Sequence, residues 1–384
     1  MNRPPRLLII DKTGGLPTSR ERTSAIADAS GFEVHLLCPT RWREHGMQFD
    51  ASAGTDGRVT VHAAPVCFSG YYARAFYRRG LGRILRTLQP DIIHLLEEPY
   101  TLFTLQTLLL ARRHCPNARI VFYTWENMDR GFNYPARIQF LYRYADRLSH
   151  RVAHGAICAT PDAHRVLLGK GFSRETTVAP YGVESCYLSG EDVERDVSRG
   201  TPRRTPVMGY IGRLLPMKGV DLLIKALPDL EDVGLELVGP GPERSPLEEL
   251  ARKLGVIERV RFLGAMGAEN VRRRMADWDL LVLPSRKTPL WMEQLGRALL
   301  EAMALGVPVV AADTGSIPWV VGECGLLFRQ DDIGGLVSAV QDLLNNREQT
   351  MERARKGKER IHGEFTWPVF AKRVTDFYRH LLEE

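Results

Sequence analysis

Two cations stand close together after a short apolar run in the second half of the chain. The run covers residues 207–211, and it is followed by Gly212, Arg213 and, five positions later, Lys218. Arginine binds two phosphate oxygens at once and lysine supplies a compact positive charge, so the pair can neutralise a diphosphate. Glycine lets the backbone approach such a ligand closely. Because the segment lacks the G-x-G-x-x-G spacing, it favours a diphosphate ligand over a nicotinamide cofactor.

Two carboxylates lie eight positions apart further along the chain. Glu293 precedes an expected helix that opens near Leu295 and Gly296, and Glu301 lies inside that helix. The first amides of a helix have no partner within it and can bind an anion. The segment follows an expected strand, at the end where open α/β sheets bind ligands. The spacing therefore predicts one carboxylate beside a phosphate and a deeper one, Glu301, that accepts hydrogen bonds from a ribose.

The elements that must position these residues alternate between short apolar strands and amphipathic segments, as in βαβ units around parallel sheets. A chain of 384 residues suits two such domains. Residues 190–206 are polar, charged and rich in Pro and Gly, so they are the best linker candidate. We expect domains over residues 1–190 and 205–365 and a final helix over 366–384. Strands are expected at residues 7–10, 34–38, 59–63, 92–96, 120–123, 155–159, 177–179, 207–211, 235–238, 260–263, 280–283, 309–311 and 325–328.

Taken together, these motifs resemble those of the retaining glycosyltransferases of family four, which have the GT-B fold. The shared features span residues 207–330 in order: the Arg213…Lys218 segment, a G-x-G-P loop at residues 239–242, and Glu293-x7-Glu301 continuing into "EAMALGVPVV". The first half is similar more faintly, through its order and "PDIIHLLEEP". The resemblance implies two Rossmann-like domains facing a central cleft. The N-terminal domain would bind the acceptor, the C-terminal domain would bind the donor, and the last helix would cross back to the N-terminal domain.

The implied activity is transfer of a sugar from a nucleotide-diphosphate donor to an acceptor that the sequence does not identify, a glycan or a lipid-linked sugar. Arg213 and Lys218 would hold the diphosphate and stabilise the charge that grows on it, and Glu293 would contact the transferred sugar. Retention in this family is thought to be a front-face substitution in which the leaving phosphate takes the acceptor's proton. Such a site needs positioning and positive charge more than a strong base.

The resemblance also implies a set of donor-binding positions. Glu301 would bind the ribose, the amides of Leu295 and Gly296 the distal phosphate, and Met266 would lie near the base. Gly14 and Gly15 resemble the N-terminal loop that closes over the phosphates. The predicted donor-binding residues are Gly14, Gly15, Gly212, Met266, Leu295, Gly296 and Glu301.

The chain departs from the family at two places. Where a histidine often follows the strand at 120–123, this chain has Trp125 and Glu126, and where a glutamate is frequent it has Trp319. Glu126 is an acceptor-side candidate, with a helix-start or surface carboxylate as the alternative. His94 is a second acceptor-side candidate that can equally be a core histidine. Trp319 can line the sugar pocket or simply pack, and Arg297 can touch the donor.

We expect no metal and no cofactor. Asp277 and Asp279 form a D-x-D pattern, but they precede a strand, at the edge opposite the expected phosphates, so a structural role is favoured. The six cysteines are scattered with no C-x-x-C pair, which argues against a zinc ribbon and fits a reducing compartment.

The positive charge of the chain is concentrated in its first half. Net charge is +6, and residues 1–190 hold 24 Lys and Arg against 16 Asp and Glu. Residues 71–90 are predicted to form an amphipathic helix, interrupted by Gly80 and Gly82, with arginines among aromatic residues that suit an anionic membrane surface. A solvated face is the alternative. No nucleic-acid-binding motif accompanies the arginines. The relevant side chains are Tyr71, Tyr72, Arg74, Phe76, Tyr77, Arg78, Arg79, Arg83 and Arg86.

Only four consecutive apolar residues precede Asp11, fewer than a signal peptide needs, and no apolar run approaches the roughly 18 residues of a membrane span. We therefore expect a cytoplasmic protein, at most peripheral to a membrane.

The Arg…Lys and Glu-x7-Glu motifs disfavour a GT-B epimerase or phosphorylase. A catalytically inactive sugar-nucleotide-binding or scaffolding protein remains an alternative.

Overall fold

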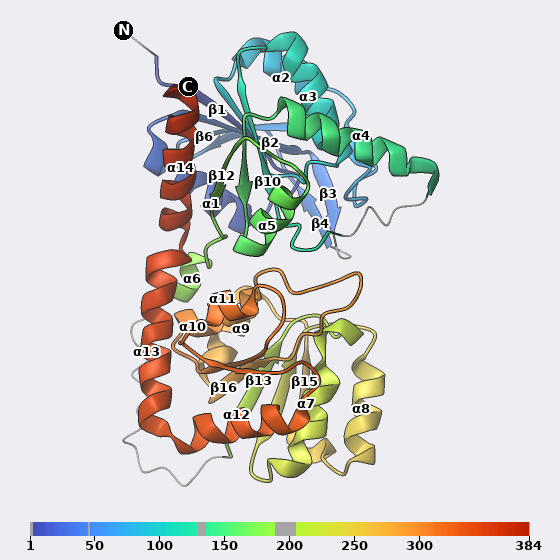
Figure 1. Ribbon diagram of the computed structural model, residues 1–384, viewed down its shortest axis with the longest axis vertical. Helices are drawn as coiled ribbons and strands as arrows, with labels where there is room; N and C mark the ends of the chain where they lie inside the picture. Colours follow the sequence, from blue (N-terminus) through green and yellow to red (C-terminus); the bar gives the residue numbers. More distant parts are fainter. Residues whose placement is uncertain (1–2, 45–46, 130–135, 189–204, 384) are drawn as a thin grey trace. The chain divides into compact units, whose positions relative to one another are not determined.

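The computed structural model describes residues 3–44, 47–129, 136–188 and 205–383. The chain divides into two compact units, Met1–Gly182 with Trp367–Glu384, and Val183–Thr366. Each unit has a parallel sheet with helices alternating along the chain (Figure 1). The expected linker at 190–206 lies almost entirely outside the described residues.

The first unit is built on an eight-stranded sheet in the order β12-β11-β10-β9-β1-β2-β6-β5. All neighbours are parallel except β5 and β6. Both faces are covered, so successive residues of one strand enter different cores: Leu7 and Ile9 enter one, Leu8 and Ile10 the other. The strands are β1 (Arg6–Ile10), β2 (Glu33–Pro39), β5 (Gly54–Asp56), β6 (Val59–Ala64), β9 (Ile92–Leu95), β10 (Arg119–Thr124), β11 (Gly155–Cys158) and β12 (Glu175–Val178).

Two layers of helices supply these cores. One layer contains α1 (Pro17–Ser30) and the C-terminal α14 (Trp367–Glu383), which pack against each other. The other contains α2 (Leu81–Leu88), α3 (Leu102–His114), α4 (Ala136–Val152) and α5 (Pro161–Gly169). The final helix expected from sequence is therefore present and contributes apolar side chains such as Phe370 and Tyr378 to the first unit.

The prediction of a single amphipathic helix over residues 71–90 is wrong. Phe76–Tyr77 is instead a short strand, β8, that pairs with β7 (Val66–Cys67), and only Leu81–Leu88 is helical. Gly80, with φ 99°, turns the chain before the helix, and Tyr77 is buried. The sequence also did not indicate a second hairpin, β3 (Arg41–Glu44) with β4 (Met47–Asp50). The five arginines of the segment are nevertheless exposed: Arg74, Arg78, Arg79, Arg83 and Arg86.

The second unit has a six-stranded, fully parallel sheet in the order β15-β14-β13-β16-β17-β18. Its strands are β13 (Val207–Ile211), β14 (Gly234–Val238), β15 (Val260–Gly264), β16 (Leu280–Leu283), β17 (Val309–Ala312) and β18 (Leu326–Phe328). Its helices are α6 (Ser185–Leu188), α7 (Val220–Ala226), α8 (Arg244–Lys253), α9 (Ala268–Ala276), α10 (Arg297–Ala304), α11 (Ile317–Val321), α12 (Ile333–Asn345) and α13 (Arg347–Glu364). Within the described ranges, no helix is long and apolar enough to cross a membrane.

Candidate active site

The strand order of the second unit brings the two sequence motifs together. From β13 the chain builds the sheet in one direction through β14 and β15, and from β16 it builds in the other through β17 and β18. Adjacent parallel strands whose connections leave in opposite directions open a crevice at their carboxyl ends, where α/β proteins bind ligands. The segments that follow β13 and β16 are residues 212–219 and 284–296. The motif with Lys218 and the motif with Glu293 therefore meet at the switch point.

Glycines allow the loops at this edge to pack backbone against backbone. Gly219 has φ 68°, and a Cβ there would lie 2.1 Å from the carbonyl oxygen of Pro284. Gly315, with φ 57°, lies equally close to Glu293, because a Cβ there would be 2.2 Å from its carbonyl oxygen. Any larger residue at either position would push two loops apart.

Lys218 and Glu293 form the centre of this edge. Lys218 Nζ donates to Glu293 Oε2 at 2.7 Å, and Ser285 Oγ donates to the same oxygen at 2.7 Å. The Lys218 ammonium also lies 4.6 Å from the ring centroid of Trp291, a cation–π contact. Because both charged side chains are mostly buried, each limits the rotamers open to the other.

A second ion-pair network, which the sequence did not indicate, holds the β16 loop in place. Arg286 binds both carboxylate oxygens of Asp221, at 2.5 and 2.9 Å, and its Nε donates to Asp331. These hydrogen bonds raise the pKa of Arg286 and lower that of Asp221, whose burial acts in the opposite direction. The Arg286 amide also donates to the Met217 carbonyl at 2.8 Å. The loop that carries Glu293 is therefore fastened to the segment that carries Lys218.

Arg213 reaches the same edge directly after β13. Its carbonyl accepts a hydrogen bond of 3.0 Å from the Tyr210 hydroxyl, and its side chain is exposed. Gly212, which precedes it, has φ 155°, and a Cβ there would lie 2.7 Å from the Tyr210 oxygen.

Glu301 lies apart from the Lys218–Glu293 pair, on α10. Its carboxylate is 3.8 Å from Arg297 and hydrogen bonds with Tyr187, and Arg297 donates to Glu184 at 3.1 Å. Burial raises the pKa of Glu301 to about 7, with the Arg297 charge acting against that rise.

Helix α10 begins at Arg297, one position after the expected opening. Gly296 is its N-cap, with φ 65° and no side chain to cap the first amides, while Leu295 is buried. Met266 lies half-buried in the loop between β15 and α9.

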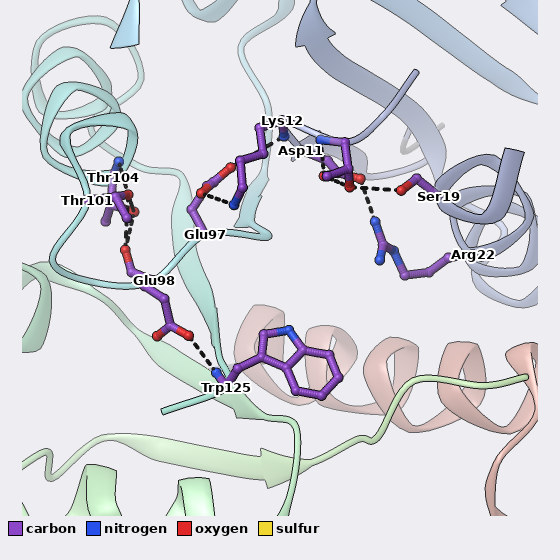
Figure 2. Close-up of polar contacts among 10 residues, drawn as sticks. Asp11, Lys12, Ser19, Arg22, Glu97, Glu98, Thr101, Thr104 and Trp125 are labelled. Carbon is purple, nitrogen blue, oxygen red and sulfur yellow. Dashed lines mark hydrogen bonds and ion pairs between the residues drawn. The ribbon is translucent and has the colours of Figure 1, made fainter. Parts of the chain in front are cut away.

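The first unit has its own switch point, between β1 and β9. Figure 2 shows the polar residues that follow these strands. Lys12 Nζ donates to Glu97 Oε2 at 2.8 Å, and both side chains are buried. Asp11 pairs with Arg22 of α1, also in a buried position. Sequence reasoning missed both pairs, although an Asp-Lys dipeptide directly after a buried strand was a usable signal.

The Asp11 carboxylate also shapes the turn that contains Gly14 and Gly15. It accepts hydrogen bonds from the amide and hydroxyl of Thr13, at 2.8 and 2.7 Å. The Gly14 amide donates to the Asp11 carbonyl at 3.1 Å, and a Cβ on Gly14 would lie 2.8 Å from that of Cys38. The turn is thus closely packed against β2.

Comparison with known proteins agrees with this architecture. The family described as glycosyl transferase 4-like domain matches residues 14–182, and the one described as glycosyl transferases group 1 matches residues 194–360. The lipopolysaccharide core biosynthesis glycosyltransferase LpsE of Rhizobium meliloti is 32% identical over 250 residues, 64% of this chain and 69% of that protein. The chain belongs to the GT-B glycosyltransferases.

Other relatives and structures are similar to this glycosyltransferase over different lengths. A GDP-mannose-dependent α-(1-6)-phosphatidylinositol monomannoside mannosyltransferase of Mycobacterium tuberculosis is 32% identical over 182 residues. That match covers 45% of this chain and 47%, about half, of the mannosyltransferase. Sucrose-phosphate synthase of Thermosynechococcus elongatus has a TM-score of 0.72 at 19% identity, covering 99% of both chains. Anabaena HepE in complex with UDP has a TM-score of 0.71 at 19% identity, covering 98% of this chain and 100% of HepE. These structures share the fold.

Trp125 and Glu126, the residues expected from the resemblance to stand where a histidine is frequent, lie directly after β10. The Trp125 amide donates to Glu98 at 2.7 Å (Figure 2), and its ring packs edge-on against Tyr181. Glu126 forms a mostly buried ion pair with Lys170, and burial raises its pKa. Glu126 is therefore neither a helix start nor a surface carboxylate.

Glu98 is a buried carboxylate that sequence reasoning did not select. Its oxygens accept hydrogen bonds from the Thr124 hydroxyl and the Trp125 amide, both at 2.7 Å. Burial and the nearby Glu126 charge raise its pKa to about 7. Glu98 thus connects the end of β9 to the end of β10 and fixes the segment that carries Glu126.

His94 lies within β9 rather than at its end. The side chain is fully buried and hydrogen bonds with the Tyr378 hydroxyl of α14, and burial lowers its pKa to about 3. This geometry favours the core interpretation of His94 over the acceptor-side one.

Trp319 and the D-x-D residue Asp279 also make contacts that support the fold. Trp319 packs edge-on against Phe365, and its carbonyl accepts from Arg360 at 2.8 Å. Asp279 accepts a 2.7 Å hydrogen bond from the Val207 amide at the amino end of β13, as expected for the edge away from the site. Among the described residues, no group of three or more His, Cys, Asp or Glu side chains is arranged to hold a metal ion.

Proposed function

We propose that this protein is an active, retaining glycosyltransferase that moves a sugar from a nucleoside-diphosphate sugar to a glycan or lipid-linked acceptor. The observation that carries the proposal is the Lys218–Glu293 pair at the switch point of the second unit, with exposed Arg213 directly after β13. An ammonium held in one orientation and a guanidinium at the same strand end supply the positive charge that a leaving diphosphate requires.

Each residue has a proposed task. Lys218 and Arg213 bind the diphosphate and stabilise the charge that develops as the glycosidic bond breaks. Glu293 orients Lys218 and contacts the transferred sugar. The leaving phosphate oxygen takes the proton of the acceptor hydroxyl, which attacks from the same face of the sugar and so retains the anomeric configuration.

The positions of their elements support the remaining donor contacts that we propose. Glu301, mostly buried on α10, accepts the ribose hydroxyls, and the amides of Leu295 and Gly296, which directly precede α10, bind the distal phosphate. Met266 contacts the base.

The donor is a nucleoside-diphosphate sugar, and no metal is required. The relatives support the donor class: HepE has been crystallised with UDP and with UDP-glucose, and the mannosyltransferases are GDP-mannose-dependent. The base and the sugar differ between those two cases, so a donor screen is needed. Arg213 and Lys218 supply the neutralising charge that a divalent cation supplies in other transferases.

The acceptor is proposed to be a saccharide that is part of a glycolipid or polysaccharide. LpsE acts in lipopolysaccharide core biosynthesis, and the mannosyltransferase acts on a phosphatidylinositol mannoside. Glu126, held by Lys170 after β10, orients the acceptor hydroxyl. Arg78, Arg79 and Arg83, all exposed around the start of α2, give weak docking to an anionic membrane surface.

Hydrolysis of a panel of UDP-, GDP- and ADP-sugars in the absence of acceptor tests the activity. Slow release of free sugar from one donor supports it, and the anomer first released, read by NMR, tests retention. Tight donor binding in a thermal-shift assay with no hydrolysis and no transfer would instead support an inactive sugar-nucleotide-binding protein.

A further inference from the structure

Helix α6 contacts two helices of the candidate donor site. It packs against α10, which carries Glu301, and against α9, which follows β15. Although α6 precedes the expected linker, it belongs to the second unit, Val183–Thr366. The backbone before it is fixed, because the Val183 amide donates to the Phe365 carbonyl at 2.8 Å. The short helix is therefore fastened beside the side chains that surround Glu301.

Tyr187 connects α6 to the carboxylate of Glu301. Its side chain is buried, and its hydroxyl hydrogen bonds to the Glu301 carboxylate. Burial, together with the charge of Glu301, raises the pKa of Tyr187 far above its usual value. The hydroxyl therefore keeps its proton, and it acts on Glu301 as a neutral hydrogen-bond donor.

A second residue of the same segment acts on Glu301 through Arg297. Arg297 donates to Glu184 at 3.1 Å, and its guanidinium lies 3.8 Å from the Glu301 carboxylate. That separation is too long for a hydrogen bond. The Arg297 side chain is also 46% exposed, so solvent screens its charge. Tyr187 therefore constrains the Glu301 carboxylate more tightly than Arg297 does.

The charges around Glu301 make this hydrogen bond important for its ionisation. Within the described residues, the groups that face Glu301 are Arg297 of its own helix and Glu184 and Tyr187 of the α6 segment, and Arg272 of α9 faces Tyr187. Burial raises the pKa of Glu301, and the Glu184 charge adds to that rise. The Arg297 charge and the Tyr187 hydrogen bond act against it. Loss of the hydroxyl would therefore favour the protonated acid, which has fewer acceptor sites for a ribose.

We propose that Tyr187 is a positioning residue for ribose recognition, because its hydroxyl holds the Glu301 carboxylate in the orientation that accepts the ribose 2′- and 3′-hydroxyls. This assignment rests on the proposed function, since it takes Glu301 to be the carboxylate that binds the donor's ribose. A carboxylate that is fixed before the ligand arrives loses little rotamer freedom on binding. Tyr187 therefore sets the preference of the site for a ribonucleoside over a 2′-deoxyribonucleoside.

Binding of nucleoside diphosphates tests the proposal without an acceptor and without turnover. The probes are UDP, GDP, ADP and their 2′-deoxy forms, titrated calorimetrically into the full-length protein. The wild type is expected to bind at least one ribonucleoside diphosphate more tightly than its 2′-deoxy form, and Glu301→Gln should lose most of that preference. Tyr187→Phe should bind the same ribonucleotide about 10-fold more weakly at pH 7, as for loss of a hydrogen bond to a charged group, with a clearly smaller loss for the 2′-deoxy form.

The pH dependence separates positioning from simple packing. The loss in Tyr187→Phe should shrink between pH 7 and pH 9, because Glu301 is then ionised in both proteins. Tyr123→Phe is the matched control, since Tyr123 is also buried and its hydroxyl donates to the Ala179 carbonyl at 2.8 Å in the first unit. It should bind every probe as the wild type does.

Two results would overturn the positioning role. One is an equal loss of ribo- and deoxyribonucleotide affinity in Tyr187→Phe. The other is a loss that stays undiminished when Tyr187→Phe is combined with Glu301→Gln. In both cases the packing of α6 alone would explain the effect, because the tyrosine would not act through the carboxylate.

The outcome is separable from that of the proposed function. A ribose preference that depends on Glu301 but not on Tyr187 would reject the positioning role alone. Failure of every nucleoside diphosphate to bind would reject the sugar-nucleotide donor, and the positioning role with it. Binding that depends on Tyr187, in a protein that hydrolyses no donor, would retain the positioning role and reject the active transferase.

Discussion

Lys218 Nζ lies 2.7 Å from Glu293 Oε2, although the two residues are 75 positions apart in the chain. The first unit repeats this relationship with Lys12 and Glu97, which are 85 positions apart and 2.8 Å from each other. In both units the lysine follows one central strand and the glutamate follows its neighbour across the switch point. Each sheet thus places a lysine–glutamate pair where α/β proteins bind ligands.

Removing either cation should slow sugar transfer. Arg213→Ala and Lys218→Ala are each expected to raise the barrier by about 2–4 kcal/mol, as for other preorganised groups that stabilise developing charge. The measurement is kcat at saturating donor, with Lys372→Ala as the control because Lys372 forms an exposed ion pair with Asp376 on α14, away from the Lys218–Glu293 motif. Near-wild-type turnover in both variants would remove these residues from the diphosphate site.

Donor affinity should depend on the ionisation of Glu301. Burial raises the pKa of Glu301 to about 7, and accepting two ribose hydroxyls requires the carboxylate. The Kd for donor is therefore expected to rise as pH falls from 8 to 6, and Glu301→Gln should flatten that dependence while weakening binding. Calorimetric titration over this range checks it. A profile that is the same in the variant and the wild type would contradict the assignment.

The free energy of unfolding should depend on pH through the raised pKa of Glu98. Its pKa is about 7 in the folded protein against 4.5 for an unperturbed glutamate, so between those values the folded protein binds more protons at this site than the unfolded chain does. The stabilising effect of Glu98 protonation is complete below about pH 4.5 and is lost as pH rises toward 7. Relative to Glu98→Gln, the wild type should lose on the order of 3 kcal/mol across this window. Urea unfolding of both proteins at several pH values measures the difference, and parallel curves would reject it.

Transfer should survive chelation. If Arg213 and Lys218 neutralise the diphosphate, activity with the identified donor is expected to be unchanged after EDTA treatment. Loss of activity that magnesium or manganese restores would show that a metal shares this task.

Anionic vesicles should bind the protein weakly and reversibly at low salt. Arg78, Arg79 and Arg83 are exposed, and each arginine near such a surface contributes about 1 kcal/mol. Replacing all three with glutamate is expected to abolish co-sedimentation with phosphatidylglycerol vesicles, while neutral vesicles should bind neither protein. Equal binding to both vesicle types, or binding that the triple change leaves intact, would favour a solvated arginine face.

The sequence by itself determined the local elements and the chemistry available at their ends. Apolar runs of three to five residues separated by helical patterns predicted the central strands of both sheets to within one or two residues, because burial on both faces leaves few polar positions in such strands. The spacing of Arg213, Lys218, Glu293 and Glu301 was sufficient to indicate a donor-binding motif. The local hydrophobic pattern was least informative at residues 71–90. There Phe76 pairs with Cys67 in a short hairpin and Gly80 turns the chain, so part of the expected helix does not form.

Only the tertiary structure decided which strand ends meet. Strand order depends on which faces and edges pack together across the whole chain. The local sequence of β1, β9, β13 or β16 does not identify the strand that will pair with it. For that reason the Lys12–Glu97 pair was not evident from sequence, and the Lys218–Glu293 contact was not evident either, although both of its residues were selected. Burial, likewise a property of the packed chain, assigned His94 to the core and raised the pKa of Glu98 and Glu301.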